Sequence, residues 1–98
     1  MEEKYLMNVY GQEAQHEEVF IVGSRERLMA LRDAIETALE KGQGNSEASV
    51  NDGEFYDIYV ICPKDEEVLK DMTMPYSAEW EKDMREKGTG PWELVNNE

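Results

Sequence analysis

One segment restricts the fold more than any other, because the sequence delimits an amphipathic helix at both ends. Ser24 is a good N-cap residue, and Gly42 stands where a glycine commonly ends a helix. Over Arg25–Lys41, apolar residues recur at the three- and four-residue spacing of one helical stripe. The stripe consists of Leu28, Leu31, Ile35, Ala38 and Leu39. We expect it to be buried against a β-sheet.

Two strand-forming segments precede this helix and two follow it. Lys4–Tyr10 is rich in strand formers, and Val19–Val22 is a short apolar run typical of a strand buried on both faces. After the helix, Glu47–Val50 and Glu54–Cys62 flank an Asp-Gly pair, which strongly indicates a hairpin. The polar residues 43–46 are expected to form a loop.

Residues 55–62 are apolar on both faces, which predicts a central strand. The helix is expected to pack Leu28, Leu31 and Ile35 on a sheet that contains residues 19–22 and 55–62. Since one helix covers only one face of this sheet, a second cover is required. The C-terminal segment or a second copy of the chain would supply it. The second reading predicts a homo-oligomer, a dimer or tetramer, with Tyr56, Tyr59 or Met74-Pro75-Tyr76 near the contact.

The last third of the chain is less periodic. Asp65–Met72 is expected to form a helical turn or two, and Ser77 is placed to cap a helix that runs to Lys87. Residues 92–95 are expected to form a terminal strand or a docked tail. The whole pattern predicts one α+β domain over residues 1–98, with an antiparallel sheet in ββαββ order and one long helix on one face. A helical or irregular C-terminal segment completes it.

The charge balance argues against several classes of partner. The 98 residues hold 23 acidic and 10 basic side chains, for a net charge of −13. Such a field repels phosphate backbones and anionic membranes, so we expect no nucleic-acid and no membrane partner. No apolar run approaches the ~18 residues of a membrane span, and the acidic start does not resemble a signal peptide. A single cysteine, Cys62, suits a reducing cytoplasm.

Catalytic and metal-binding motifs are not evident. His16 is the only histidine and falls in an expected loop, whereas Cys62 ends an expected strand. A nucleophile and base must lie within hydrogen-bonding reach, and nothing in the pattern places these two together. The spacing of a metal site, a phosphate-binding loop or a nucleophile elbow is also missing. We therefore expect a protein that is not an enzyme and that needs no cofactor or metal.

The junction between Val22 and Arg27 is the strongest candidate for a ligand site. It would combine the free N–H groups of a helix N-terminus with the Ser24 hydroxyl and the guanidiniums of Arg25 and Arg27, with Arg32 about 20° from Arg25 around the helix. These groups suit a phosphate, and aromatic side chains suit a nucleotide base. The aromatic candidates are Tyr56, Tyr59, Tyr76 and Trp80. The plainer alternative is that Ser24 only caps the helix and the arginines balance neighbouring acids.

Four features follow one another along residues 19–76. They are Val22-Gly23-Ser24-Arg25-Glu26, the Leu28/Leu31/Ile35 helix, Asp52-Gly53-Glu54-x-Tyr56, and Pro75-Tyr76. In size, order and character the chain resembles small phage-encoded anti-CBASS sponges, which sequester cyclic-nucleotide immune signals. This resemblance implies a non-enzymatic oligomer that binds a cyclic dinucleotide between subunits and so counteracts bacterial anti-phage defence.

An acidic protein-blocking inhibitor is the alternative. Such a protein, an anti-CRISPR-like nucleic-acid mimic or a toxin-immunity protein, presents carboxylates in place of phosphates and associates quickly with a basic cleft. The acids of the C-terminal third would serve this purpose: Asp65, Glu66, Glu67, Asp71, Glu79, Glu81 and Asp83. A continuous acidic ridge would favour the inhibitor, whereas an arginine-lined pocket at an oligomer interface would favour the sponge.

Overall fold

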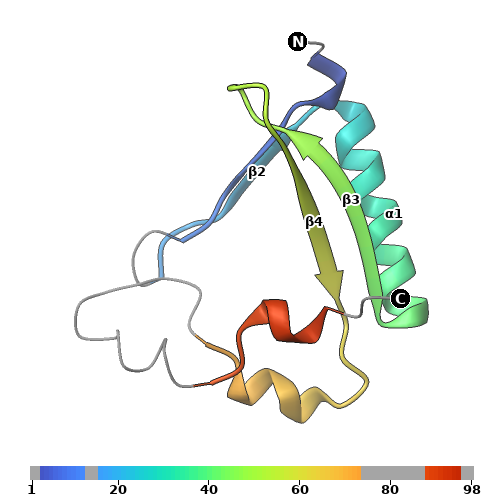
Figure 1. The fold of residues 1–98 in the computed structure, drawn as a ribbon, viewed down its shortest axis with the longest axis vertical. Coiled ribbons are helices and arrows are strands. Elements are labelled where there is room, and N and C mark those ends of the chain that lie inside the picture. Colours follow the sequence, from blue (N-terminus) through green and yellow to red (C-terminus); the bar gives the residue numbers. More distant parts are fainter. Residues whose placement is uncertain (1–2, 13–15, 74–87, 96–98) are drawn as a thin grey trace.

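A computed structural model describes residues 3–12, 16–73 and 88–95, and it confirms the α+β class and the ββαββ order. Figure 1 shows one long helix beside two β-ribbons that diverge from a common corner. The elements are β1 (Met7–Tyr10), β2 (Phe20–Gly23), α1 (Arg25–Lys41), β3 (Gln43–Ser49) and β4 (Phe55–Ile61). The helix has the bounds that its capping residues predict.

The strands form two antiparallel pairs in place of one sheet. β1 pairs with β2 from Met7↔Gly23 to Tyr10↔Phe20, and β3 pairs with β4 along its whole length. In the described residues the two ribbons are joined by a single parallel bridge, Leu6↔Ser49. β4 therefore has one strand neighbour in this part of the chain. The expectation of a central strand at residues 55–62 is wrong.

Both ends of α1 are capped as expected. The Ser24 hydroxyl accepts a hydrogen bond from the Arg27 N–H at 3.2 Å. At the other end Gly42 adopts φ 94°, and its N–H donates to the Ala38 carbonyl at 2.7 Å. A left-handed residue at this position is accessible to glycine at little cost, which explains the sharp end of the helix.

The helix buries a different face from the predicted one. Ala34 and Ala38 are only 3% and 1% exposed, whereas Leu39 is 70% exposed and Leu28 and Ile35 are also exposed. The buried face is thus turned about 70° from the centre of the predicted stripe and overlaps it at Ala38 and at the half-buried Leu31. The expectation that Leu28 and Ile35 pack on the sheet is wrong in this structure, whereas Ala38 is buried as expected.

A close backbone contact explains this orientation. A Cβ atom placed on Gly44 of β3 would lie 2.1 Å from the Ala34 carbonyl oxygen, so helix and strand touch almost directly at this point. Only a glycine opposite a small helical residue allows such an approach. A stripe of leucines would hold the two elements further apart, because interaxial distance grows with side-chain size.

β2 also departs from expectation. The run Val19–Val22 is predicted to be buried on both faces, yet its four side chains are 48–60% exposed. Neither α1 nor β4 covers this ribbon, which leaves the body of the molecule at its Leu6 end. The buried set in the described residues is small: Met7, Ala34, Ala38, Gly44, Ala48, Ser49 and Gly90.

The hairpin between β3 and β4 is confirmed, but β3 starts earlier than predicted. Gly53 has φ 89°, and the Asp52 carboxylate accepts a hydrogen bond from the Glu54 N–H at 2.9 Å. Residues 43–46 belong to β3, not to a loop, and all pair with β4. Their polar composition does not predict a strand, which forms here because these residues pair with β4.

The C-terminal part is irregular, as expected. Residues 66–71 form a short 3-10 helix, η2 (Glu66–Asp71), whose first turn is capped by the Asp65 carboxylate. Residues 91–94 form η4 (Pro91–Leu94), a 3-10 turn and not a strand. The expected helix over residues 77–87 lies outside the described residues, as does the segment from Met74 to Tyr76.

The contact between α1 and β3 yields a stability prediction. We expect Gly44→Ala to destabilise the protein by about 1–3 kcal/mol or more, because the added methyl group has no room beside Ala34. Gly11→Ala is the matched control, since a Cβ there meets nothing within 4 Å. Urea denaturation of both variants gives the two free energies of unfolding. Equal stabilities would contradict the close contact.

Candidate functional site

The backbone carbonyls of residues 4–7 hold the corner where the two ribbons and the helix meet. Each accepts a hydrogen bond from a residue of another element. The Ser24 hydroxyl donates to the Lys4 carbonyl at 2.7 Å, and the Ser24 N–H donates to the Leu6 carbonyl at 3.0 Å. The Ser49 hydroxyl donates to the Tyr5 carbonyl at 3.3 Å, and the Tyr56 hydroxyl donates to the Met7 carbonyl.

This corner uses two of the predicted ligand residues for internal contacts. Ser24 donates its hydroxyl proton to Lys4 and accepts from Arg27, so its hydroxyl already serves the fold in both directions. Tyr56 faces Met7, and its ring is half-buried. Both residues therefore have structural contacts that the sequence analysis did not assign to them, apart from the cap at Ser24.

The other predicted ligand residues are spread over the molecule. Arg25 lies nine residues before Ala34, which places it about 180° from the buried face of α1. Arg32 is on the same exposed side, where its guanidinium lies 3.3 Å from the carboxylate of Asp33. Tyr59 is exposed on β4, on the opposite face from Tyr56 because the two are three positions apart along the strand. The structure does not bring these four residues together.

Tyr76 and Trp80 lie outside the described residues, so the structure places neither of them. The phosphate and base contacts predicted for these two aromatic residues and for Arg25 remain predictions.

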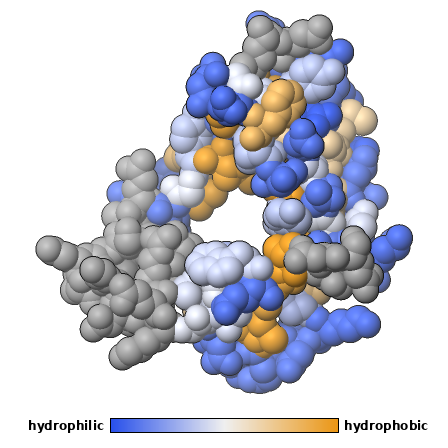
Figure 2. All heavy atoms as spheres, in the orientation of Figure 1, coloured by the Kyte–Doolittle hydropathy of each residue, from blue (hydrophilic) through white to orange (hydrophobic). Residues whose placement is uncertain are grey.

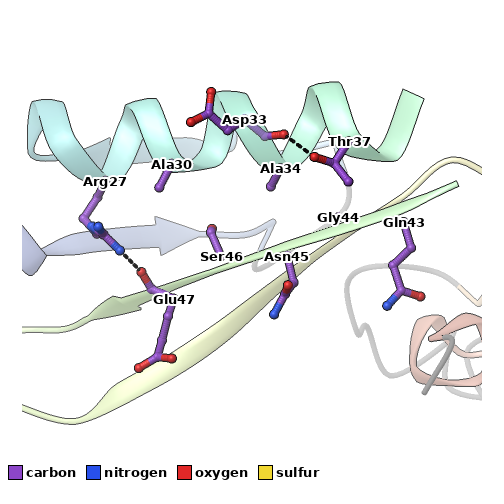
Figure 3. A pocket seen from close by; sticks show the side chains of 10 residues that line it. All are labelled: Arg27, Ala30, Asp33, Ala34, Thr37, Gln43, Gly44, Asn45, Ser46 and Glu47. Carbon is purple, nitrogen blue, oxygen red and sulfur yellow. Dashed lines mark hydrogen bonds between the residues drawn. The ribbon is translucent and has the colours of Figure 1, made fainter. Parts of the chain in front are cut away.

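A polar groove runs along α1 beside β3, and Arg27 lies in its wall. Its volume is about 460 Å³, which is within the range of small-molecule sites. Figure 3 shows the helix as one wall and the strand as the other. The lining residues are Arg27, Ala30, Asp33, Ala34, Thr37, Gln43, Gly44, Asn45, Ser46 and Glu47.

Arg27 supplies the positive charge of this groove. Its Nη1 donates to the Glu47 carbonyl oxygen at 2.5 Å, which ties the first helical turn to β3. The guanidinium also lies over the Tyr5 ring, 5.9 Å from the centroid, so one face of it rests on an aromatic surface. Figure 3 shows the Glu47 side chain pointing away from α1, so its carboxylate does not face this guanidinium.

Two buried polar atoms of the groove have no hydrogen-bond partner in the described structure. They are Nε of Arg27 and the hydroxyl oxygen of Ser46. Figure 3 shows the Ser46 side chain directed toward the helix. Most buried polar atoms in proteins are satisfied, so two exceptions along one groove favour a polar ligand at this position.

The sequence analysis placed the Arg27 guanidinium at the junction but preferred Arg25 and Arg32 as ligands, and it missed the β3 side of the groove. One signal was present: Ser46 is a hydrogen-bonding residue shortly after a helix that places Arg27 two turns before Ala34, on the same side of the helix. The assignment of residues 43–46 to a loop hid it.

Comparison of the chain with family models, with curated proteins and with solved structures finds no match. Among the described residues, no group of three histidine, cysteine or carboxylate side chains is arranged to hold a metal ion. In residues 3–12, 16–73 and 88–95, no helix has the length and apolar character needed to cross a bilayer.

The contact of Tyr56 predicts how stability depends on pH. Burial raises the pKa of Tyr56 above its ordinary value of 10.0. The stabilisation of the folded protein by the neutral Tyr56 hydroxyl is complete below pH 10. It is lost as the pH rises through the folded-state pKa, because Tyr56 of the unfolded chain ionises at a lower pH. We expect Tyr56→Phe to lose about 0.5–1.5 kcal/mol at neutral pH. The variant should also show a smaller decline in stability at alkaline pH.

Urea denaturation at several pH values measures this difference. Tyr59→Phe is the control, because Tyr59 is an exposed tyrosine of the same strand. If the free energy of unfolding of Tyr56→Phe declines at alkaline pH as steeply as that of the wild-type protein, the hydroxyl contact does not contribute to stability as described.

Proposed function

We propose that the protein is a non-enzymatic binding protein that sequesters a phosphorylated, nucleotide-like molecule in the groove between α1 and β3. The observation that carries the proposal is the Arg27 guanidinium in the wall of a groove of about 460 Å³. A guanidinium beside the first turn of a helix suits a phosphate, since the helix dipole adds to its positive charge. Arg27 thus replaces Arg25 and Arg32 as the leading phosphate ligand.

The rest of the lining suits the other parts of a nucleotide. The hydroxyls of Ser46 and Thr37 suit base edges and sugar oxygens, with Thr37 as an acceptor because its hydroxyl already donates to the Asp33 carbonyl at 2.9 Å. A cyclic dinucleotide presents all of these groups together with its phosphates, which makes this class the first to test.

Ser46 and Arg27 provide the sharpest variants. Ser46→Ala removes a buried hydroxyl that has no partner in the described residues, so it should leave stability unchanged or raise it. The same change should weaken ligand binding. Arg27→Lys keeps the charge but loses the planar pair of donors, and we expect it to weaken phosphate binding by about 1.5–3 kcal/mol.

Calorimetry and thermal denaturation against cyclic dinucleotides, cyclic mononucleotides and inorganic phosphate test the proposal. At 100 times Kd, a ligand adds about 2.7 kcal/mol of stability, which raises Tm by more than about 10 °C in a domain of this size. Lys70→Gln, which removes a positive charge from the exposed surface of η2, is the control outside the groove and should bind as the wild-type protein does. No heat and no Tm shift with the whole panel, or equal affinity for all three variants, would contradict the proposal.

A second candidate function, an acidic surface that binds a basic protein, is favoured by one cross-strand pair. Glu47 and Asp57 lie directly opposite each other in the β3–β4 register, and both are exposed. Like charges in this position repel. The exposed rings of Phe55 and Tyr59 flank Asp57 on the same face. Aromatic rings around a repelling acidic pair suit a basic partner that neutralises it.

This arrangement predicts that the acidic pair costs stability. We expect Asp57→Asn to stabilise the isolated protein by about 0.2–1 kcal/mol, because it removes the repulsion from Glu47. Glu36→Gln, which removes the same charge from an exposed position on α1, is the control and should have a smaller effect. Urea denaturation at low ionic strength measures both. A destabilised Asp57→Asn protein would argue against a strained acidic surface.

A further inference from the structure

The side chain of Arg27 crosses one end of the groove, from α1 to β3 (Figure 3). Its Nη1 donates to the Glu47 carbonyl oxygen, and within the described residues this is the one hydrogen bond of its guanidinium. A single hydrogen bond holds one point of a planar group and leaves the plane free to turn about that point. Any further restraint on the guanidinium must therefore come from packing.

The ring of Tyr5 supplies such a restraint. Tyr5 ends the 3-10 helix η1 (Glu3–Tyr5), which contacts α1. The Cζ atom of Arg27 lies 5.9 Å from the centroid of this ring, within the distance at which a guanidinium is attracted to an aromatic face. Because the guanidinium is planar, it stacks on a ring in a way that an ammonium group does not. The ring thus limits the orientations that the Arg27 guanidinium can adopt.

Tyr5 is itself held at its backbone and at its side chain. Its carbonyl oxygen accepts a hydrogen bond from the hydroxyl of the buried Ser49 at 3.3 Å. Its ring lies 6.0 Å from the ring of Phe55, measured between centroids, at a tilt of 56°. This is a favourable geometry for an aromatic pair. A ring that is fixed in both ways can in turn fix a side chain that packs on it.

The surroundings of Tyr5 differ from those of the other exposed tyrosines. The Lys4 Nζ lies 5.1 Å from the centroid of its ring, so two cations of a strongly acidic chain meet this one side chain. They make both of the cation–ring contacts found among the described residues. Tyr5 is 37% exposed, so its ring lies at the surface beside the groove and is not part of the buried core.

We propose that Tyr5 is a positioning residue of the groove, whose ring holds the Arg27 guanidinium in the orientation that binds a phosphate group of the ligand. This role rests on the binding function proposed above. A free arginine side chain loses much rotamer entropy when a ligand orders it, whereas one that the fold has already ordered avoids this cost. The Tyr5 hydroxyl forms no hydrogen bond within the described residues, so the effect depends on the ring.

NMR spectroscopy of the Arg27 side chain tests the contact without a ligand. Protons that lie over an aromatic face resonate upfield, so Tyr5→Leu should shift the Arg27 side-chain signals downfield. Tyr5→Phe keeps the ring and should leave them near their wild-type positions. Tyr10→Leu removes an exposed tyrosine of β1 and is the control. Unshifted Arg27 signals in Tyr5→Leu would overturn the proposal.

Titration with cyclic dinucleotides, cyclic mononucleotides and inorganic phosphate, followed by NMR, tests the role in binding. We expect Tyr5→Leu to weaken binding by about threefold or more, and Tyr5→Phe to bind as the wild-type protein does. In an Arg27→Gln background, Tyr5→Leu should cause no further loss, because Tyr5 acts through Arg27. If Tyr5→Leu does not fold, Tyr5→Met removes the ring with a smaller loss of volume and replaces it in both experiments.

The results distinguish this role of Tyr5 from the binding function on which it rests. If no compound of the panel binds the wild-type protein, both proposals fail, whatever the NMR signals of Arg27 show. If a compound binds and Tyr5→Leu binds it equally tightly, only the role of Tyr5 is overturned. Equal losses of affinity in the wild-type and Arg27→Gln backgrounds would show that Tyr5 supports the fold of the groove and does not position Arg27.

Discussion

Four carbonyl groups of a short N-terminal segment, residues 4–7, hold the structure together. A helix N-cap, a buried serine of β3 and a tyrosine of β4 all hydrogen-bond to this one stretch of backbone. Two ribbons that share a single bridge would otherwise have little to fix their relative position. Because the buried Ser49 hydroxyl and the half-buried Tyr56 hydroxyl need hydrogen-bond partners, they and Ser24 fix the corner by polar contacts where few apolar ones exist.

The sequence predicts what depends on local chemistry. Ser24 and Gly42 set the ends of α1, and the Asp-Gly pair sets the hairpin, because capping and turn formation involve neighbours in the chain. It does not predict the face that α1 buries. That choice depends on Gly44, which approaches the helix only after β3 has paired with β4. A leucine stripe predicts that this surface of the helix is covered, but it does not identify what covers it.

In the candidate site, too, the sequence predicts the features that depend on neighbours in the chain and not those that depend on tertiary contacts. The position of a positive group near the start of α1 follows from the sequence, but Arg25, Arg27 and Arg32 differ in what they contact. Arg27 is the one turned toward β3, where it reaches the Glu47 carbonyl. The β3 wall of the groove could not be predicted, because residues 43–46 have the composition of a loop. Strands that tertiary pairing imposes on polar residues are invisible to local propensity.

The contact of Gly44 with Ala34 has an evolutionary consequence. Because α1 is held to β3 through a glycine and small helical residues, the exposed side chains of Leu28, Ile35 and Leu39 are not needed for that contact. Mutations in Leu28, Ile35 or Leu39 can therefore alter what the protein associates with while the helix stays in place. Mutations at the glycine have the opposite effect. Selection on association and selection on folding thus act on separate sets of positions in the same two elements.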